Sequence, residues 1–141
     1  MKKQTILLVN PNQMKPPVTP VALDYLARAL EGKGFGVEVL DLAFSSDTEG
    51  DVRFAVQRAH PLLIGVTVRN LDDSYLASQD FCLERIKSII DLIKAHSQAP
   101  LVLGGVGFSI APEAALAYCG VDLGIRGEGE EALPLLAYLL P

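Results

Sequence analysis

The sequence predicts an α/β fold in which one sheet of five parallel strands lies between two layers of helices. Five short apolar runs rich in Val, Leu and Ile recur along the chain, and their unbroken apolar character is typical of strands buried on both faces. Helical patterns separate these runs, so consecutive strands are joined by crossovers and lie parallel. We expect the strand order 2-1-3-4-5. With 141 residues, half of them hydrophobic, the chain can bury the core of one domain.

The first two strands are predicted over Thr5–Asn10 and Val37–Leu42, where the apolar residues form continuous runs. Between them, Val21–Gly32 is predicted to be helical because its leucines recur every three or four positions. Thr19 can cap this helix, and Pro20 suits its first position.

The middle of the chain supplies the third and fourth strands, at Leu62–Val68 and Leu101–Gly104. Before the third strand, Asp51–Ala59 has a weak helical pattern. After it, Phe81–His96 has a strong one, because its isoleucines stand at helical spacing.

The last strand is predicted over Val121–Arg126, between helices at Pro112–Tyr118 and Glu130–Leu140. Pro134 removes a backbone donor near the start of the final helix, so the pattern does not fix that start. The whole succession corresponds to a Rossmann-like or flavodoxin-like three-layer sandwich.

Charge and apolar patterning exclude several classes of partner. The chain has 12 Lys and Arg against 17 Asp and Glu, a net charge of −5, and no basic cluster that would bind a nucleic acid. The apolar run Ile6–Val9 is too short for a signal peptide or a membrane span, so we expect a cytoplasmic protein without a membrane partner. Cys82 and Cys119 have the spacing of neither a zinc site nor a disulfide framework, and we expect reduced, buried thiols.

Long strand-to-helix connections indicate a binding surface at one edge of the sheet. The segments PNQMKPPVT, RNLDDSYLAS and GVGFSIAP are all longer than chain reversal requires, whereas the helix-to-strand connections are short. In the expected strand order, a crevice opens outside the carboxyl ends of the first and third strands, beside the fourth. Gly104 ends that fourth strand, and Gly105 and Gly107 follow it. They predict either a tight turn before a helix or the close approach of a ligand.

Several known uses of such a fold do not fit. Neither GxxxxGK[ST] nor GxGxxG occurs after the first strand, and the third strand does not end in the Asp of a phosphoacceptor domain. The loop after the first strand has no hydroxyl for a flavin phosphate before Thr19. His60 and His96 lie at predicted helix ends on the opposite edge, so no nucleophile has a base within reach. We therefore assign no catalytic acid, base or nucleophile and no metal ligand.

Four stretches of the chain resemble one known family. They are ILLVNPN, IGVTVRNLDDS, VLGGVGFSIAPEAAL and GVDLGIRGEGEEALPLL, of which the last two, with their spacing, are the most specific. Together they resemble the N-terminal cobalamin-binding domain of cobalamin-dependent radical SAM enzymes over nearly all 141 residues. The resemblance implies that residues 1–141 form such a domain within a longer polypeptide. The end of the sequence at AYLLP, directly after an apolar helix, agrees with this expectation.

The resemblance also implies where the cofactor binds. In that family the nucleotide tail of cobalamin enters along the sheet edge near the third and fourth strands. The residues implied are Gly104, Gly105, Val106, Gly107 and Phe108 at the tail, Thr67, Arg69 and Asn70 beside it, and Gly127, Glu128 and Gly129 at the rim. Arg69 either contacts the ligand or pairs with an aspartate of the loop that follows it. Glu128, like Glu130 and Glu131, either caps the last helix or contacts the cofactor.

Two departures from related domains affect the expected chemistry. The loop NPNQMKPP lacks the DxHxxG motif, whose histidine binds cobalt in methionine synthase and the mutases. The lower face of the corrin is therefore left to Asn10, Asn12, Gln13 or Met14, or to water. The CxxxCxxC motif of radical SAM domains is also missing, which assigns the 4Fe-4S cluster and S-adenosylmethionine to a domain beyond this chain.

The function implied by the resemblance is a module that binds cobalamin and positions the corrin for a downstream radical SAM domain of the same polypeptide, in methyl transfer. Two alternatives stay open at this point. One is a regulatory or interaction domain of the same fold that has lost the cofactor, and the other is a flavin- or nucleotide-binding α/β domain.

Overall fold

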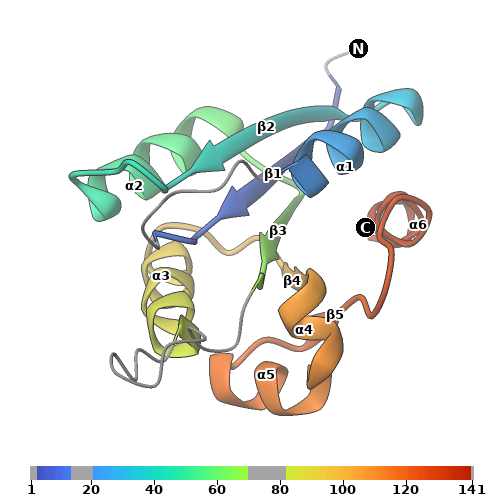
Figure 1. The fold of residues 1–141 in the computed structure, drawn as a ribbon. Coiled ribbons are helices and arrows are strands. Elements are labelled where there is room, and N and C mark those ends of the chain that lie inside the picture. Colours follow the sequence, from blue (N-terminus) through green and yellow to red (C-terminus); the bar gives the residue numbers. More distant parts are fainter. Residues whose placement is uncertain (1–2, 14–20, 70–81, 141) are drawn as a thin grey trace.

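The computed structural model describes residues 3–13, 21–69 and 82–140 of the chain as an α/β sandwich (Figure 1). Its strands are β1 (Thr5–Asn10), β2 (Gly36–Asp41), β3 (Leu63–Thr67), β4 (Leu101–Gly104) and β5 (Leu123–Gly124). Its helices are α1 (Val21–Gly32), α2 (Thr48–Ala59), α3 (Cys82–His96), α4 (Val106–Ile110), α5 (Pro112–Cys119) and α6 (Ala132–Leu139). The cap predicted at Thr19 and Pro20 lies outside the described residues.

The five strands form one parallel sheet in the order β2-β1-β3-β4-β5, which confirms the predicted order. β1 lies between β2 and β3, so that Leu7 is opposite Glu38 on one side and Ile64 on the other. Because all strands are parallel, their carboxyl ends meet at one edge of the sheet. The long connections predicted to form a binding surface start from this edge.

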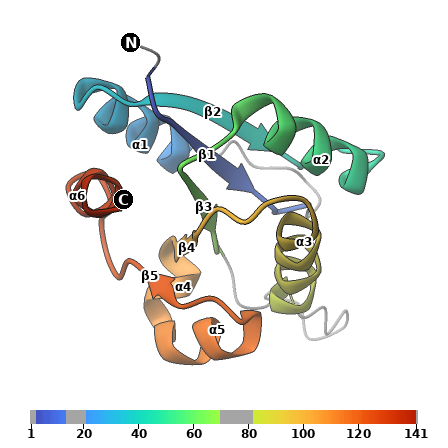
Figure 2. The ribbon, with the colours of Figure 1, turned by 180° about the vertical axis from the view of Figure 1, so that it is seen from behind.

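Alternate strand residues supply two hydrophobic cores, one on each face of the sheet. Ile6 and Leu8 belong to the core that contains residues of α1 and α6, whereas Leu7 and Val9 belong to the core that contains residues of α2, α3 and α5. Figures 1 and 2 show α1 and α6 on one side of the sheet and α2 and α3 on the other. Burial on both faces accounts for the unbroken apolar runs of the strands.

The fifth strand is shorter than the sequence predicts. Val121 donates its N–H to the carbonyl of Leu116, so it still belongs to the turn that ends α5. β4 ends at Gly104 and pairs only with Leu123 and Gly124 of β5. The predicted range Val121–Arg126 is too long because a strand extends only as far as a neighbour can pair with it.

Two helix starts also differ from the predicted ones, for local reasons. α2 begins earlier because the carboxylate of Asp47 accepts the N–H of Gly50 at 3.1 Å and caps the helix. α6 begins at Ala132, so Pro134 falls in the first turn, where a backbone N–H has no helical partner to lose.

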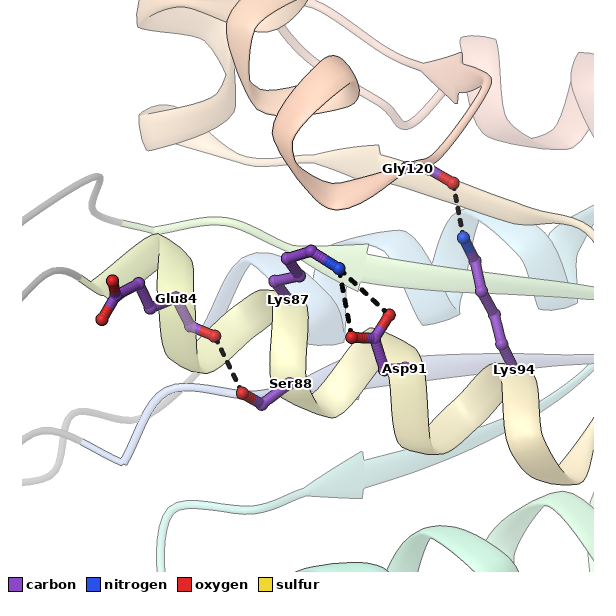
Figure 3. A network of polar contacts seen from close by, with 6 residues as sticks. All are labelled: Glu84, Lys87, Ser88, Asp91, Lys94 and Gly120. Atoms are coloured by element: carbon purple, nitrogen blue, oxygen red, sulfur yellow. Dashed lines mark hydrogen bonds and ion pairs between the residues drawn. The ribbon is translucent and has the colours of Figure 1, made fainter.

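Polar contacts lie along α3, and one of them holds the end of α5 (Figure 3). The ammonium group of Lys94 donates a hydrogen bond to the carbonyl of Gly120, which follows α5 in the left-handed conformation. On the same helix, Lys87 forms an ion pair with Asp91 one turn away. A cation at a helix C-terminus meets carbonyl groups without helical partners and the negative end of the helix dipole, so Lys94 stabilises this end.

The cysteine and histidine placements agree with the sequence predictions where the structure describes them. Cys119 is buried and free, and burial raises the pKa of its thiol, which therefore stays protonated near neutral pH. The side chain of Cys82 lies outside the described part. His60 follows α2 and His96 ends α3, each at the edge opposite the long connections. Among the described helices, none combines the length and the apolar character that crossing a bilayer requires.

Replacing Gly120 with Ala should destabilise the protein by about 1–2 kcal/mol, because the left-handed conformation at φ +68° brings a Cβ close to the following carbonyl. The matched control is Gly32→Ala at the end of α1, where an added Cβ would meet nothing within 4 Å. That change should leave stability equal or slightly higher. Urea denaturation measures both variants, and equal effects would contradict the left-handed end assigned to α5.

Candidate functional site

A cavity of about 760 Å³ opens at the carboxyl edge of the sheet, on the face covered by α1 and α6. Leu8, Gly65 and Val102 form its floor, one from each of the three central strands β1, β3 and β4. Leu26 of α1 and Leu133 of α6 line its walls. A cavity of this volume with mainly apolar walls is typical of small-molecule sites.

Two neighbouring glycines at the end of β4 lack side chains for different reasons. A Cβ on Gly105 would lie 2.6 Å from the main-chain oxygen of Val68, and Gly105 has φ +106°, so the fold itself requires glycine there. A Cβ on Gly104 would meet only the carbonyl oxygen of Ile125, at 3.8 Å. Gly104 lines the cavity. The predicted tight turn therefore explains Gly105, and the room for a ligand is at Gly104.

The glycines lead into α4, a short helix that the sequence analysis did not predict. The N–H groups of Gly107 and Phe108 both donate to the carbonyl of Val68, at 2.9 and 3.2 Å, and the N–H of Ser109 donates to Gly105. These amides are thus occupied and do not form the open cradle that binds phosphate at helix N-termini. The turn after β4 therefore does not provide the phosphate site that a flavin or nucleotide would need.

Ser109 joins the two glycine-bearing segments at one side of the cavity. Its hydroxyl donates to the carbonyl of Gly105 at 3.1 Å, and the same oxygen accepts the N–H of Gly127 at 2.9 Å. Both glycines line the cavity. One side chain therefore fixes the turn after β4 to the loop between β5 and α6.

At the end of β1, Asn10 is a buried polar residue that lines the same cavity. Its Nδ2 donates to Asp41 at 3.0 Å, and its Oδ1 accepts the N–H of Asn12 at 3.2 Å. The Asn10 amide therefore holds the ends of β1 and β2 together and orders the loop that follows β1.

The residues predicted for the lower face of a corrin divide into separate groups. Asn10 and Asn12 line the cavity, whereas the Gln13 amide donates to the carbonyl of Leu42 at 3.0 Å and to the hydroxyl of Thr48 at 3.3 Å. The side-chain amide of Gln13 is thus hydrogen-bonded to the connection between β2 and α2. Met14 is outside the described residues. In the described ranges, no three His, Cys, Asp or Glu side chains gather as a metal site.

The cavity brings together most of the residues that the resemblance implied. Its lining includes Asn10, Asn12, Thr67, Arg69, Gly104, Gly105, Val106, Gly127, Glu128 and Gly129. Gly107 and Phe108 are buried and do not belong to this lining. The Phe108 ring lies in the core on the face of α2 and α3, where a Cβ on Gly124 would collide with it. Asn70 lies outside the described residues.

Charged side chains stand at the mouth of the cavity. Arg69, Glu128 and Glu130 line it and are exposed. Glu131 is the N-cap residue of α6, but its side chain makes no capping hydrogen bond, so the predicted capping role does not apply to it. The aspartates predicted as partners of Arg69 fall outside the described ranges.

The sequence analysis missed the floor and the helical wall of the cavity. Val21 and Leu26 of α1 line it, although in the sequence they form part of an ordinary helical pattern. Gly65 carries the signal that could have located the floor, because a glycine inside a strand often marks the close approach of another group.

Both the sequence and the fold of the chain match those of known proteins. A family model for the B12 binding domain matches residues 11–137. Tryptophan 2-C-methyltransferase of Streptomyces laurentii is 43% identical over an alignment 141 residues long, which covers 99% of this chain and 24% of that protein. The structure of the radical S-adenosylmethionine methyltransferase TsrM from Kitasatospora setae, with cobalamin and a [4Fe-4S] cluster bound, matches with a TM-score of 0.93 at 42% identity, over 99% of this chain and 25% of that one. The chain thus spans about a quarter of the length of these relatives.

A more distant structure shares the fold alone. The cobalamin-dependent S-adenosylmethionine radical enzyme OxsB, with aqua-cobalamin bound, matches with a TM-score of 0.72 at 22% identity, over 99% of this chain and 19% of that one. The family match, in contrast, covers most of the chain and includes the ends of β3 and β4, the loop after β5 and the first turns of α6, which line the cavity. The chain therefore belongs to the B12-binding domain family, as its motifs predicted.

Proposed function

We propose that the domain binds cobalamin with the nucleotide tail in the cavity and the corrin at its mouth. It then presents the corrin to a radical SAM domain of the same polypeptide for methyl transfer. The observation that carries this proposal is Gly104, whose missing side chain leaves space in the cavity at the strand ends. The TsrM structures hold cobalamin, a [4Fe-4S] cluster and a SAM analogue. They support a cobalamin-binding domain and a radical SAM domain in one polypeptide.

The side chains of the cavity fit the chemistry of such a tail. Leu8 and Val102 offer an apolar floor for a flat aromatic base. Thr67 is half-buried, and no hydrogen bond of its hydroxyl is found within the described residues, so it can donate to a ring nitrogen. Arg69 at the mouth can pair with the phosphate through its fork of donors.

In this proposal the chain itself binds the cofactor and orients it. When bound, cobalamin would supply a cobalt centre that can carry a methyl group. Asn10 and Ser109 fix the segments on either side of the cavity through their hydrogen bonds. The loop after β1 contains no histidine in its sequence, so we infer that this domain provides no histidine ligand to cobalt.

We propose that the full-length protein is a cytoplasmic radical SAM methyltransferase in which residues 1–141 are one domain. The 43% identity to tryptophan 2-C-methyltransferase, over about a quarter of that protein, supports the reaction class. The 4Fe-4S cluster, S-adenosylmethionine and the methyl acceptor would then belong to the remainder of the polypeptide. The proposed cytoplasmic location is supported by Cys119, which is a free thiol, and by a cysteine spacing unlike that of a disulfide framework.

Replacing Gly104 with Leu should weaken cobalamin binding by roughly 10- to 100-fold, because overfilling a packed site costs about 1–3 kcal/mol. The variant should stay folded, since the nearest atom to the new Cβ is 3.8 Å away. The measurement is a titration with hydroxocobalamin, in which the corrin absorbance that comigrates with the protein in gel filtration gives the bound fraction.

The matched control for this experiment is Gly32→Leu, which adds the same side chain in open space at the end of α1. It should bind as the original protein does, and circular dichroism checks that both variants are folded. Unchanged cobalamin uptake by folded Gly104→Leu protein would refute the placement of the nucleotide tail in this cavity. Gly105 is unsuitable for this test, because any side chain there meets the Val68 carbonyl and strains the fold itself.

The hydroxyl of Thr67 is expected to contribute about 1 kcal/mol to cobalamin binding, or roughly fivefold in affinity. Thr67→Val keeps the shape of the side chain and removes the hydroxyl, so it should lower affinity by this factor. Thr67→Ser keeps the hydroxyl and should bind more tightly than Thr67→Val. Absorbance titrations give the dissociation constants of both variants. Equal values would exclude a hydrogen bond from the Thr67 hydroxyl to cobalamin.

Ser109 is expected to act as a positioning residue for the cavity wall. Ser109→Ala should raise the dissociation rate of cobalamin roughly fivefold, as expected for loss of about 1 kcal/mol, and Ser109→Thr should restore most of the loss. The amide of Gly127, which donates to the Ser109 hydroxyl, should also lose hydrogen-exchange protection in Ser109→Ala. If that amide stays protected, the hydroxyl does not hold the two segments together.

A further inference from the structure

We infer that Asp41, an exposed carboxylate of the edge strand β2 that does not line the cavity, is a positioning residue for cobalamin binding and acts through Asn10. The inference rests on the proposed function and deepens it, because it names a residue outside the cavity that controls a polar group inside it. It follows from a series of hydrogen bonds that leads from the connection after β2 to the cavity.

The group that Asp41 controls is a buried amide. Asn10 is 3% exposed, and it is the one buried polar residue in the part of the chain that the structure describes. Ile6, Leu8 and Asn10 alternate along β1, so the Asn10 side chain lies on the face of the sheet that carries the cavity. Because a buried amide without partners is costly, the groups that hold Asn10 determine what it can do there.

Two neighbours fix the direction of this amide. Its Nδ2 donates to Asp41 at 3.0 Å, and its Oδ1 accepts the N–H of Asn12 at 3.2 Å. An ionised carboxylate only accepts hydrogen bonds and a backbone N–H only donates them, so neither partner tolerates a reversed amide. The nitrogen therefore stays toward β2 and the oxygen toward the loop after β1.

This arrangement leaves one N–H of Asn10 for a ligand. An amide nitrogen carries two N–H groups, Asp41 takes one, and no second acceptor is found among the described residues. Asn10 lines the cavity. The remaining N–H can thus donate to cobalamin, whose carboxamides and phosphate carry acceptor oxygens.

Asp41 can orient Asn10 because the main chain orients Asp41. The N–H of Ala43 donates to Asp41 Oδ1 at 3.0 Å, and the same oxygen accepts the Asn10 amide. The register of β1 and β2 also places Asn10 directly beside Asp41. An aspartate that accepts the N–H two residues later is held in a local turn, so this carboxylate is fixed although it is exposed.

The first experiment separates the position of the Asp41 oxygen from its charge. Asp41→Ala should weaken hydroxocobalamin binding to the 141-residue protein roughly fivefold, the effect of losing about one hydrogen bond. Asp41→Asn keeps an oxygen that can accept from Ala43 and Asn10, so it should retain most of the affinity. Absorbance titration supplies the dissociation constants, and circular dichroism checks that each variant is folded.

The matched control is Asp91→Ala. Asp91 is also exposed and also paired, with Lys87, but it lies on α3, which packs against the opposite face of the sheet. The variant removes the same charge as Asp41→Ala and should bind cobalamin as the original protein does. An equal loss in Asp91→Ala would assign the effect to net charge and overturn the inference.

A double-mutant cycle tests whether Asp41 acts through Asn10. Asn10→Ala should itself weaken binding about fivefold, because it removes the amide that faces the ligand. Adding Asp41→Ala to that variant should then change the dissociation constant by less than about twofold, since no amide is left to orient. Losses that multiply in the double variant would overturn the assignment of Asp41 as a positioning residue.

The remaining outcomes separate the inference from the function on which it rests. Equal affinity of folded Asp41→Ala and the original protein would overturn the inference while leaving cobalamin binding intact. Affinity as low in Asp41→Asn as in Asp41→Ala would also overturn it, because an oriented oxygen would then not suffice. If the original protein does not bind hydroxocobalamin, the proposed function fails together with the inference.

Discussion

The geometry of the cavity depends on one main-chain contact, between the end of β3 and the turn that begins α4. Val68 donates its N–H to the carbonyl of Gly104 at 2.7 Å, and its own carbonyl accepts the N–H groups of Gly107 and Phe108. This contact continues the sheet one residue beyond β3 and then turns the chain out of it. The turn requires glycine at 105, because the Val68 oxygen occupies the place of a Cβ. As a result, β4 stops at Gly104, and the bare end of that strand lines the cavity.

The two faces of the sheet are covered unequally, and the cavity is a consequence. On one face, residues of α2, α3 and α5 form a continuous core, and the Phe108 ring from α4 belongs to it. On the other face, α1 and α6 supply a smaller set of buried residues. The strand ends between these two helices are left uncovered. α4 thus contributes to both faces, since its aromatic side chain fills one core while Val106 lines the cavity.

The sequence was sufficient for features that depend on local chemistry and insufficient for those that depend on pairing between distant segments. The bounds of β1, β4 and α1 follow from unbroken apolar runs and helical spacing, and the strand order follows from crossover rules. α4 and the short β5 could not be predicted this way, because they depend on the hydrogen bonds that Val68 and Leu116 make across turns. The motifs indicated the edge at which the cavity opens, but they could not tell that Gly104 faces the cavity while Phe108 faces the opposite core.

Hydrogen bonds within the chain hold two sides of the cavity in place before any ligand enters. Asn10 ties the ends of β1 and β2 together, and Ser109 ties two loops together, so folding itself has already fixed both sides of the site. A ligand that enters does not have to order these two sides, which favours tight binding. The aliphatic floor at Leu8 and Val102 gains from being covered, since burial of apolar surface is favourable. A ligand that binds the folded state alone also stabilises it by mass action, so cofactor binding and domain stability are coupled through the same cavity.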